Sequence, residues 1–143
     1  MYKICTFADM GKAFRMDIAL QPGDIDALSH VNNVVYLQWV QDVSAAHWFE
    51  LSTPEIRDQY AWVVLRHEID FIKSAKWGDE LYAETWVGDT AGFKSVRHVN
   101  IFNTNNDLLV RAQTTWCMID AKQFRPARFT AEVLDVLEQG RKG

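Results

Sequence analysis

The sequence predicts an α+β domain in which one long helix covers one face of a curled antiparallel sheet. Residues 33–49 contain no Gly or Pro and few polar side chains, which is typical of a buried helix. After residue 60, four segments rich in alternating apolar and polar residues follow one another, separated by short polar links. A sheet must bury one face, and this helix is the only large element available to cover it.

The first predicted element is a strand over Phe14–Leu20, where apolar residues recur at every second position. We expect residues 1–12 to form a loosely structured entry to this strand. Residues 21–23 then break the strand, because Pro fixes φ and Gly permits a positive φ. This turn delivers the chain directly to Asp24.

The long helix is predicted to start among Ser29, Asn32 and Asn33, since each is a good N-cap residue. It is expected to end near Leu51–Pro54. The proline there suits the first turn of a second, short helix that runs to Gln59. Polar residues within the long helix form one narrow stripe, so most of its circumference is apolar.

A run of strands is predicted for the second half of the chain. The strands are Trp62–Ile72, Glu80–Val87, Lys94–Asn103 and Leu108–Asp120, and the links are residues 77–79, 88–92 and 103–107. On the first strand, one parity is placed on the packed face, namely Leu65, His67, Ile69 and Phe71. Because the links are short, we expect consecutive strands to be antiparallel neighbours.

A short amphipathic helix closes the chain. Thr130 suits its N-cap and Gly140 its end. Val133, Leu134 and Leu137 fall on one stripe, which we expect to pack against the domain.

The composition limits the class of protein. A chain of 143 residues, 48% of them hydrophobic, is long enough for one domain with a substantial core, so residues 1–143 are predicted to form a single domain. The net charge of −4 argues against bulk nucleic acid as a partner. No membrane span or signal sequence is evident, so a cytoplasmic location is expected. Cys5 and Cys117 lie far apart and form no Cys-x-x-Cys pair, so neither structural zinc nor a disulfide framework is expected.

The stretch that carries the chemistry is Asp24-Ile-Asp-Ala-Leu-Ser-His-Val-Asn-Asn33. It places two carboxylates, a histidine and two asparagines immediately before the long helix. The first N–H groups of a helix have no intrahelical partner and carry the positive end of its dipole, so they suit a reaction in which an oxyanion develops. A bare Asp-x-Asp by itself is more often a turn or a cap.

This stretch, continued to Tyr36, resembles the signature of hotdog-fold thioesterases of the 4-hydroxybenzoyl-CoA thioesterase family. It is also similar to the Asp-x-Asp-x-x-x-His-Val-Asn-Asn segment of plant acyl-ACP thioesterases. Three later segments resemble the strands of that family in the expected order, namely His67–Ile72, Gly78–Leu81 and Leu108–Ala112. The resemblance covers roughly Phe14 to Leu137.

The resemblance implies a hotdog fold, in which a five- or six-stranded antiparallel sheet wraps around one central helix. It implies hydrolysis of acyl-CoA to a free acid and CoA, with coenzyme A present only as part of the substrate and with no metal. It also implies a homodimer or tetramer whose active sites are shared between subunits.

The resemblance assigns roles to individual residues. Asp26 matches the aspartate that acts as base or nucleophile, and the main-chain N–H of Asn33, seven residues later, matches the donor that polarises the thioester carbonyl. His30 matches a proposed catalytic group, with a loop residue that orients Asp26 as an equal alternative. Asp24 is favoured as a turn residue. Leu28 stands where the acyl-ACP pattern has Asn, which weakens that reading.

Substrate contacts are expected from four further residues. Asn32 is a helix-entry residue first and a substrate contact second, and Tyr36 either reaches the pocket or belongs to the core. Lys94 and Ser95 resemble a pair near the nucleotide end of the coenzyme. His67 is favoured as a hydrogen-bonded core or interface residue. Other candidate phosphate contacts are Lys73, Lys76, Arg125 and Arg128.

Three alternatives to an acyl-CoA thioesterase remain. One keeps the chemistry and changes the carrier to acyl-ACP. The second is a non-catalytic hotdog module that binds acyl-CoA. A hotdog dehydratase is less favoured, because the long helix offers only Asp42 and His47 and lacks the required spacing.

Overall fold

The computed structural model describes residues 13–142, so the loosely structured entry predicted for residues 1–12, with Cys5, lies outside the described residues. One 3-10 turn (η2) precedes the long helix. The elements are β1 (Phe14–Ile18), η2 (Pro22–Asp24), α1 (Asn33–Leu51), α2 (Pro54–Gln59), β2 (Tyr60–Phe71), β3 (Leu81–Ala91), β4 (Lys94–Asn103), β5 (Leu108–Asp120) and α3 (Ala131–Gln139). The predicted bounds of α2, β4 and β5 are confirmed.

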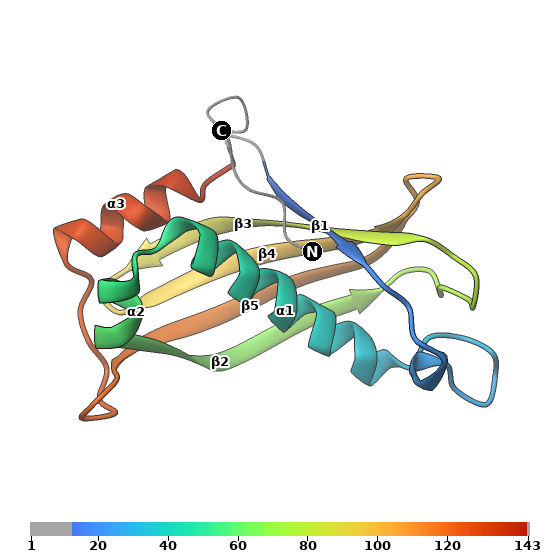
Figure 1. The fold of residues 1–143 in the computed structure, drawn as a ribbon, viewed down its shortest axis with the longest axis horizontal. Helices are drawn as coiled ribbons and strands as arrows, with labels where there is room; N and C mark the ends of the chain where they lie inside the picture. The colour runs from blue at the N-terminus through green and yellow to red at the C-terminus, as the bar shows by residue number, and fades with distance from the viewer. Residues whose placement is uncertain (1–12, 143) are drawn as a thin grey trace.

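The five strands form a single antiparallel sheet with the order β1-β3-β4-β5-β2. The helix α1 lies lengthwise across one face of this sheet. The short helix α3 lies beside the second half of α1 (Figure 1). The predicted α+β class is confirmed, and the arrangement is that of a hotdog fold. One face of the sheet and one long helix together enclose the core.

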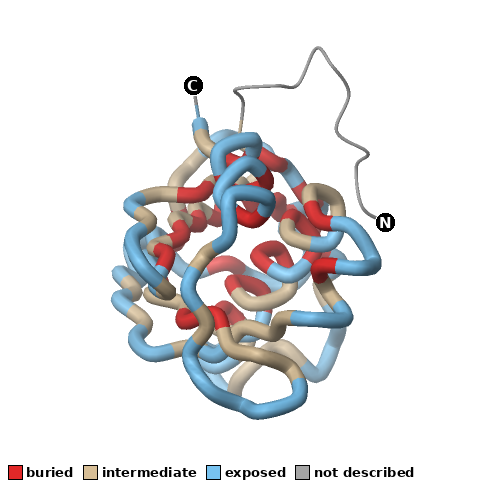
Figure 2. Tube along the Cα trace, turned by 90° about the vertical axis from the view of Figure 1, so that its left-hand side faces the viewer, coloured by how far each residue is buried: buried red, intermediate tan, exposed pale blue. Residues whose placement is uncertain are grey.

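The core lies between α1 and the sheet. Val40 and Val43 on α1 are fully buried, as are Val99 and Ile101 on β4. The buried parts of the chain gather in the interior, while the outer loops are exposed (Figure 2). Burying each such side chain contributes about 1.5–3 kcal/mol. Within residues 13–142, no helix has the length and apolarity needed to cross a membrane.

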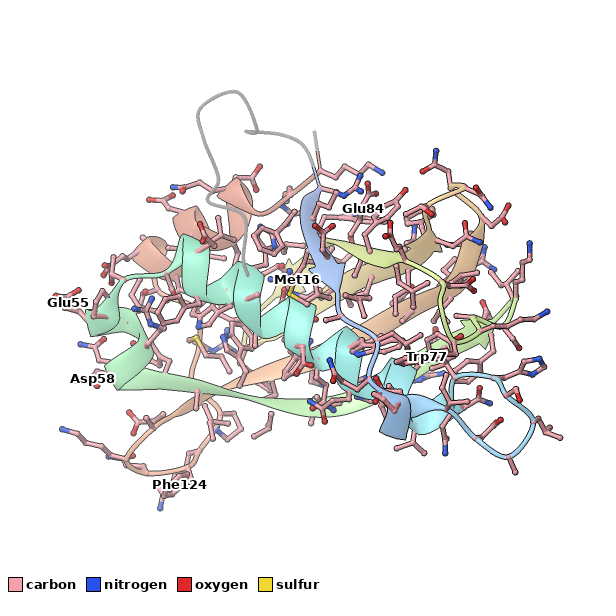
Figure 3. The ribbon with its side chains drawn as sticks, turned by 45° about the vertical axis from the view of Figure 1, so that its right-hand side comes forward. Met16, Glu55, Asp58, Trp77, Glu84 and Phe124 are labelled. Atoms are coloured by element: carbon pink, nitrogen blue, oxygen red, sulfur yellow. The ribbon has the colours of Figure 1, made fainter. Side chains whose placement is uncertain are left out.

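The outer side of α1 carries the narrow polar stripe that the sequence predicts. The Gln38 side-chain amide donates to Asp42 Oδ1 over 2.8 Å, one turn further along the helix. Met16 on β1 lies beside this helix (Figure 3), and its side chain is buried. The stripe therefore leaves the rest of the helix free to pack.

The prediction that consecutive strands are neighbours is wrong for β2 and β3. β2 pairs with β5 along its whole length and forms one edge of the sheet, whereas β3 pairs with β1 and β4. The segment between Phe71 and Leu81 is a connection that crosses to the far side of the sheet, and not a hairpin. The turn signal at Gly78, which has a φ of 95°, is real but does not join adjacent strands.

The position of Leu65 on the packed face of β2 is also wrong. The pairing of β2 with β5 shifts register between Val64 and Arg66, so Leu65 is 51% exposed, while His67 and Ile69 are partly buried. Phe71, at the end of the strand, is 47% exposed, so its expected place on the packed face is wrong as well. A β-bulge adds one residue and reverses the alternation that follows it. Counting parity along the sequence cannot detect such an insertion.

The end of β3 also differs from the prediction. β3 continues through the expected link to Ala91, with a register shift between Val87 and Thr90, and the chain turns at Gly92, whose φ is 69°. In α3 the cap is as expected, since Thr130 Oγ1 accepts the Val133 N–H over 3.2 Å.

The buried stripe of α3 differs by one position. Val133, Val136 and Leu137 are buried, and Leu134 is 45% exposed. Leu134 therefore contributes less to the core than its apolar character suggests.

Leu109 and Leu134 form a matched pair for testing this assignment of the core. We predict that Leu109→Ala lowers the free energy of unfolding by about 2–5 kcal/mol, because Leu109 is 1% exposed and its removal leaves a cavity. Leu134→Ala is expected to change it by less than about 1 kcal/mol. Urea denaturation measures both, and equal losses would contradict the assignment.

Candidate active site

The loop before α1 is folded around Asp26. The Asp26 N–H donates to His30 O over 2.8 Å, and Asp26 Oδ1 accepts the N–H groups of Leu28 at 2.9 Å and His30 at 3.2 Å. Ser29 adopts a φ of 64° so that the loop can close. Asp26 is a short side chain whose oxygen lies within reach of these two main-chain N–H groups. The two hydrogen bonds hold its carboxyl group in one orientation.

Only one oxygen of the Asp26 carboxylate is used in this way. Among residues 13–142, its Oδ2 atom has no hydrogen-bond partner. Asp26 is partly buried, so one oxygen remains available to a substrate or a water. Asp24 is different: its Oδ2 accepts the Gln21 N–H over 2.8 Å, as expected of a turn residue.

The start of α1 presents one unused main-chain donor beside this loop. Asn32 caps the helix, since its Oδ1 accepts the Val34 N–H over 3.0 Å and its carbonyl accepts the Val35 N–H over 2.9 Å. The Asn32 N–H donates to Asp24 O over 2.8 Å, which ties the loop to the helix start. In the described part of the chain, the Asn33 N–H has no acceptor. It lies at the positive end of the helix dipole.

The segment before β3 supports the same end of α1. The Val31 N–H donates to Ala75 O and the Ala75 N–H donates to the Tyr36 hydroxyl, each over 2.9 Å. Burial raises the pKa of Tyr36, and its side chain is only 2% exposed. Tyr36 therefore fits the core interpretation, and this chain offers it no open surface as a substrate contact.

Large apolar side chains are exposed on the segments that meet at this end of the molecule. Trp77, 57% exposed, lies near the start of α1 (Figure 3). We call the exposed set the apolar rim: it comprises Leu28, Val34, Phe71, Ile72 and Trp77. An exposed apolar group of this kind is typical of a binding surface.

Lys94 and Ser95 lie at the opposite end of the fold. Ser95 is 5% exposed, bonds Thr90 Oγ1 through its Oγ over 2.9 Å, and lines a cavity under the second half of α1. Lys94 is exposed. The 19 residues of α1 span about 27 Å, so one chain does not bring this pair to Asp26. Ser95 faces inward and does not meet a phosphate at the surface.

The other candidate cations divide in the same way. Lys76 is joined to His30 by a β-bridge, which brings it next to the Asp26 loop. Lys73 is already paired with Asp107, at 2.9 Å. Arg125 and Arg128 follow β5 in a loop that joins the end of α2 through Ala121 N–H and Gln59 O, far from the start of α1. Lys76 is therefore the best placed of the four.

A buried pair that was not predicted from the sequence, Arg97 and His47, lies at the second half of α1. Arg97 is 6% exposed, and its Nη1 donates to His47 Nδ1 over 2.8 Å and to Thr85 Oγ1 over 3.1 Å. Since a guanidinium only donates, His47 Nδ1 is an acceptor and the ring is neutral. Burial, together with the charge of Arg97, lowers the pKa of His47 to about 3. Arg97 shares parity with the buried Val99 and Ile101, and this was the signal available in the sequence.

Two further reactive side chains are His67 and Cys117. His67 Nδ1 bonds Thr114 Oγ1 over 2.8 Å, which confirms the hydrogen-bonded interpretation, and burial lowers its pKa. Cys117 is buried and free. Within the described range, no group of three or more His, Cys, Asp or Glu side chains is placed to hold a metal ion.

The fold and the loop together define a hotdog domain with a carboxylate and a free main-chain donor at the start of its central helix. The model of the acyl-ACP thioesterase N-terminal domain family matches residues 11–137. The chain therefore belongs to the acyl-ACP thioesterase N-terminal domain family.

Two curated relatives and one solved structure illustrate the similarity. The putative acyl-CoA thioesterase YneP of Bacillus subtilis is 25% identical, over 80% of this chain and 86% of its own length. The chloroplastic acyl-[acyl-carrier-protein] hydrolase FATB3 of Cuphea viscosissima is 24% identical over 89% of this chain, which spans only 33% of that relative. The Staphylococcus aureus protein SAV2348, solved in complex with CoA, superimposes with a TM-score of 0.80 at 12% identity, covering 91% of this chain and 86% of its own.

The buried neutral histidine predicts a pH dependence of stability. The pKa of His47 is about 3 in the folded chain and about 6.5 unfolded, so the unfolded state binds more protons between these values. The stabilisation that the neutral His47 provides is fully present above pH 6.5 and is lost as the pH falls below that value. Between pH 7.5 and 4.5 the loss is about 2–3 kcal/mol.

His47→Asn is the matched variant, because the amide oxygen still accepts from Arg97 and does not titrate. Urea denaturation at several pH values should show a shallower acid loss for the variant than for the natural protein. Parallel pH profiles would contradict the assignment.

Proposed function

We propose that the protein hydrolyses acyl-CoA thioesters to a free carboxylic acid and CoA, with Asp26 as general base or nucleophile. The observation that carries this proposal is the pairing of a half-used carboxylate with an unused helix N–H, held together by the Asp26–His30 turn and the Asn32 cap. In the reaction, water supplies a hydroxyl to the acyl carbon and a proton to the departing thiolate, and the C–S bond breaks.

Each group has a part in this reaction. The thioester oxygen accepts the Asn33 N–H, which stabilises negative charge as the carbonyl is attacked. Asp26 Oδ2 either takes the proton from the attacking water or attacks the carbonyl itself. His30 shapes the turn through its main chain, and its side chain is the candidate second acid–base group beside Asp26. Asn32 sets the helix entry and borders the acyl group.

The apolar rim and nearby cations fit an acyl-CoA substrate. Exposed apolar side chains beside a polar reaction centre suit an acyl chain. Lys76 is next to the loop and offers a cation for the phosphates of the coenzyme. The S. aureus structure contains CoA and the B. subtilis relative is named as a putative acyl-CoA thioesterase, and both support this carrier.

Acyl-ACP is the second candidate carrier, favoured by the family model and by the plant relative. Leu28 departs from the acyl-ACP pattern and weighs against it. Hydrolysis rates for one acyl group on both carriers decide between them. A non-catalytic acyl-CoA-binding module would instead show saturable binding without turnover.

We infer that two copies assemble through the free edge of β2. This strand of 12 residues pairs with β5 on one side only, and Val63 and Leu65 on it are 39% and 51% exposed. A long apolar edge strand is a template for pairing with another strand. Edge-to-edge pairing would make a homodimer, and two such dimers would make a tetramer. A shared active site would then place Lys94 of a second copy near Asp26, where one chain alone does not.

We predict that Asp26→Asn lowers kcat by about 10²–10⁴-fold. The amide oxygen of Asn still accepts the Leu28 and His30 N–H groups, so the loop and the stability are retained while the base is lost. Thiol release from a panel of acyl-CoA esters measures the rate. A rate equal to that of the natural protein would refute the role of Asp26.

The main-chain donor is testable with proline. Asn33→Pro deletes the unused main-chain N–H. Pro is well tolerated at the first helical position. The preceding residue, Asn32, has φ −63° and ψ 135°, which is the conformation that a following Pro requires. We predict a loss of about a hundredfold or more in kcat. Asn33→Ala keeps the donor and should remain near the natural rate, so similar rates for both variants would exclude this donor.

A substitution on the exposed edge of β2 should change the molar mass of the protein in solution. Leu65→Asp introduces facing negative charges into the proposed pairing and should shift the protein towards the monomer, with loss of activity if sites are shared. Leu134→Asp is the control, because Leu134 is similarly exposed but lies on α3. Light scattering after size exclusion measures both, and an unchanged mass for Leu65→Asp would argue against this interface.

A further inference from the structure

A pocket lies away from the Asp26 loop, between the second half of α1 and the sheet. Its volume is about 360 Å³, which is within the usual range for small-molecule sites. Ser44 is its first residue on α1, 11 residues beyond Asn33 and so about 16 Å along the helix. Leu137 of α3 closes the same end, where α3 lies beside α1 (Figure 1).

The walls of this pocket are aromatic. Trp48 and Trp62 meet edge to face with ring centroids 5.3 Å apart, and Phe49 and Trp116 complete the lining. Flat aromatic walls suit an aryl ring or a short alkyl chain.

Two indole groups in the lining lack a hydrogen-bond partner. The Nε1 atoms of Trp62 and Trp116 are both buried, and neither has an acceptor within residues 13–142. An indole N–H is a donor only. A buried donor left unpaired is unfavourable and rare, so each such group calls for an explanation. A ligand with acceptor atoms supplies one.

The charge in the pocket points to the same kind of ligand. Arg97 lines the pocket, and its recorded partners, His47 and Thr85, are both neutral. Among residues 13–142, no Asp or Glu lines the pocket, whereas a second arginine, Arg57, does. Arg57 lies over the Phe49 ring at 4.1 Å. A buried cation without a carboxylate is costly unless an anion joins it.

The strand register places Trp116 between the other two residues, with Arg97 on one neighbouring strand and Trp62 on the other. Trp116 on β5 pairs with Ser95, and Arg97, two residues further along β4, is its diagonal neighbour on the same face. Trp116 also pairs with Val64 of β2, so Trp62 is its diagonal neighbour on the other side. One carboxylate has about four acceptor positions, so it is able to accept from the neighbouring Arg97 and Trp116 together.

We propose that this pocket binds a small organic acid, whose carboxylate rests on Arg97 and accepts the indole N–H of Trp116. The hydrophobic body of the acid lies against Trp48 and Phe49. This binding does not depend on the proposed hydrolysis. The acid is either a product of that reaction or a separate effector, and both sources share the same chemistry.

Calorimetric titration of the full chain tests the proposal with benzoate, phenylacetate and hexanoate, each beside its uncharged amide. At least one acid should bind saturably, and about tenfold or more tightly than its amide. Absence of any preference for acid over amide across the three pairs would overturn the proposal.

Variants locate the carboxylate. Arg97→Gln should weaken binding of the acid about tenfold or more and leave the weak binding of the amide unchanged. Trp116→Phe, which removes one donor and little volume, provides a second variant should Arg97→Gln fail to fold. Arg111→Gln is the matched control, since Arg111 is an exposed arginine paired with Asp70 on the surface. Equal affinity in the Arg97 or Trp116 variant and in the control would place the acid elsewhere and overturn the proposal.

Inhibition kinetics separate the two sources of the acid. A product acid should compete with the acyl-CoA ester, while a separate effector should alter kcat without competing. Either pattern agrees with binding in the pocket. Because calorimetry needs no turnover, a protein that binds the acid and hydrolyses no thioester would refute the proposed function and leave this inference intact.

Discussion

The packing of α1 against the sheet is the constraint on which the rest of the structure depends. The helix is apolar around most of its circumference, so water is excluded from it only if another element wraps it. The curved sheet meets this need on one side, and the Gln38–Asp42 pair faces outward on the other. With one side of the helix buried against the sheet along its length, its two ends become the places where polar chemistry meets the core.

At the first end, the exposed dipole and the loop before the helix work together. Asn32 satisfies one main-chain donor, while the Asn33 N–H is left without an acceptor among the described residues. Asp26 holds its own loop with one oxygen and offers the other. A rigid core beneath this end keeps these groups in position, because Tyr36 anchors the Ala75 segment from inside. Asp26 and the Asn33 N–H are thus positioned by the packed core.

At the second end, polar groups are enclosed instead of exposed. Arg97 enters the interior from the sheet and finds His47 on α1, and burial forces that histidine to stay neutral. Two tryptophans bring donors to the same place without acceptors. Buried polar groups that are not satisfied oppose folding, and this cost is the reason for proposing a ligand at this pocket. The molecule therefore has two polar centres at opposite ends of one helix.

Local sequence determined a large part of this protein. The bounds of α2, β4 and β5, the cap at Thr130 and the turn role of Asp24 follow from capping, alternation and turn chemistry, all of which act over a few residues. The loop from Asp26 to Asn33 was identified as the candidate site from its residue types and its resemblance to a family. Tertiary structure alone decided the rest. The place of β2 at the sheet edge, the bulge at Leu65 and the meeting of Arg97, His47 and the two indoles depend on pairing between strands far apart in the chain, and no local pattern encodes which strand lies beside which.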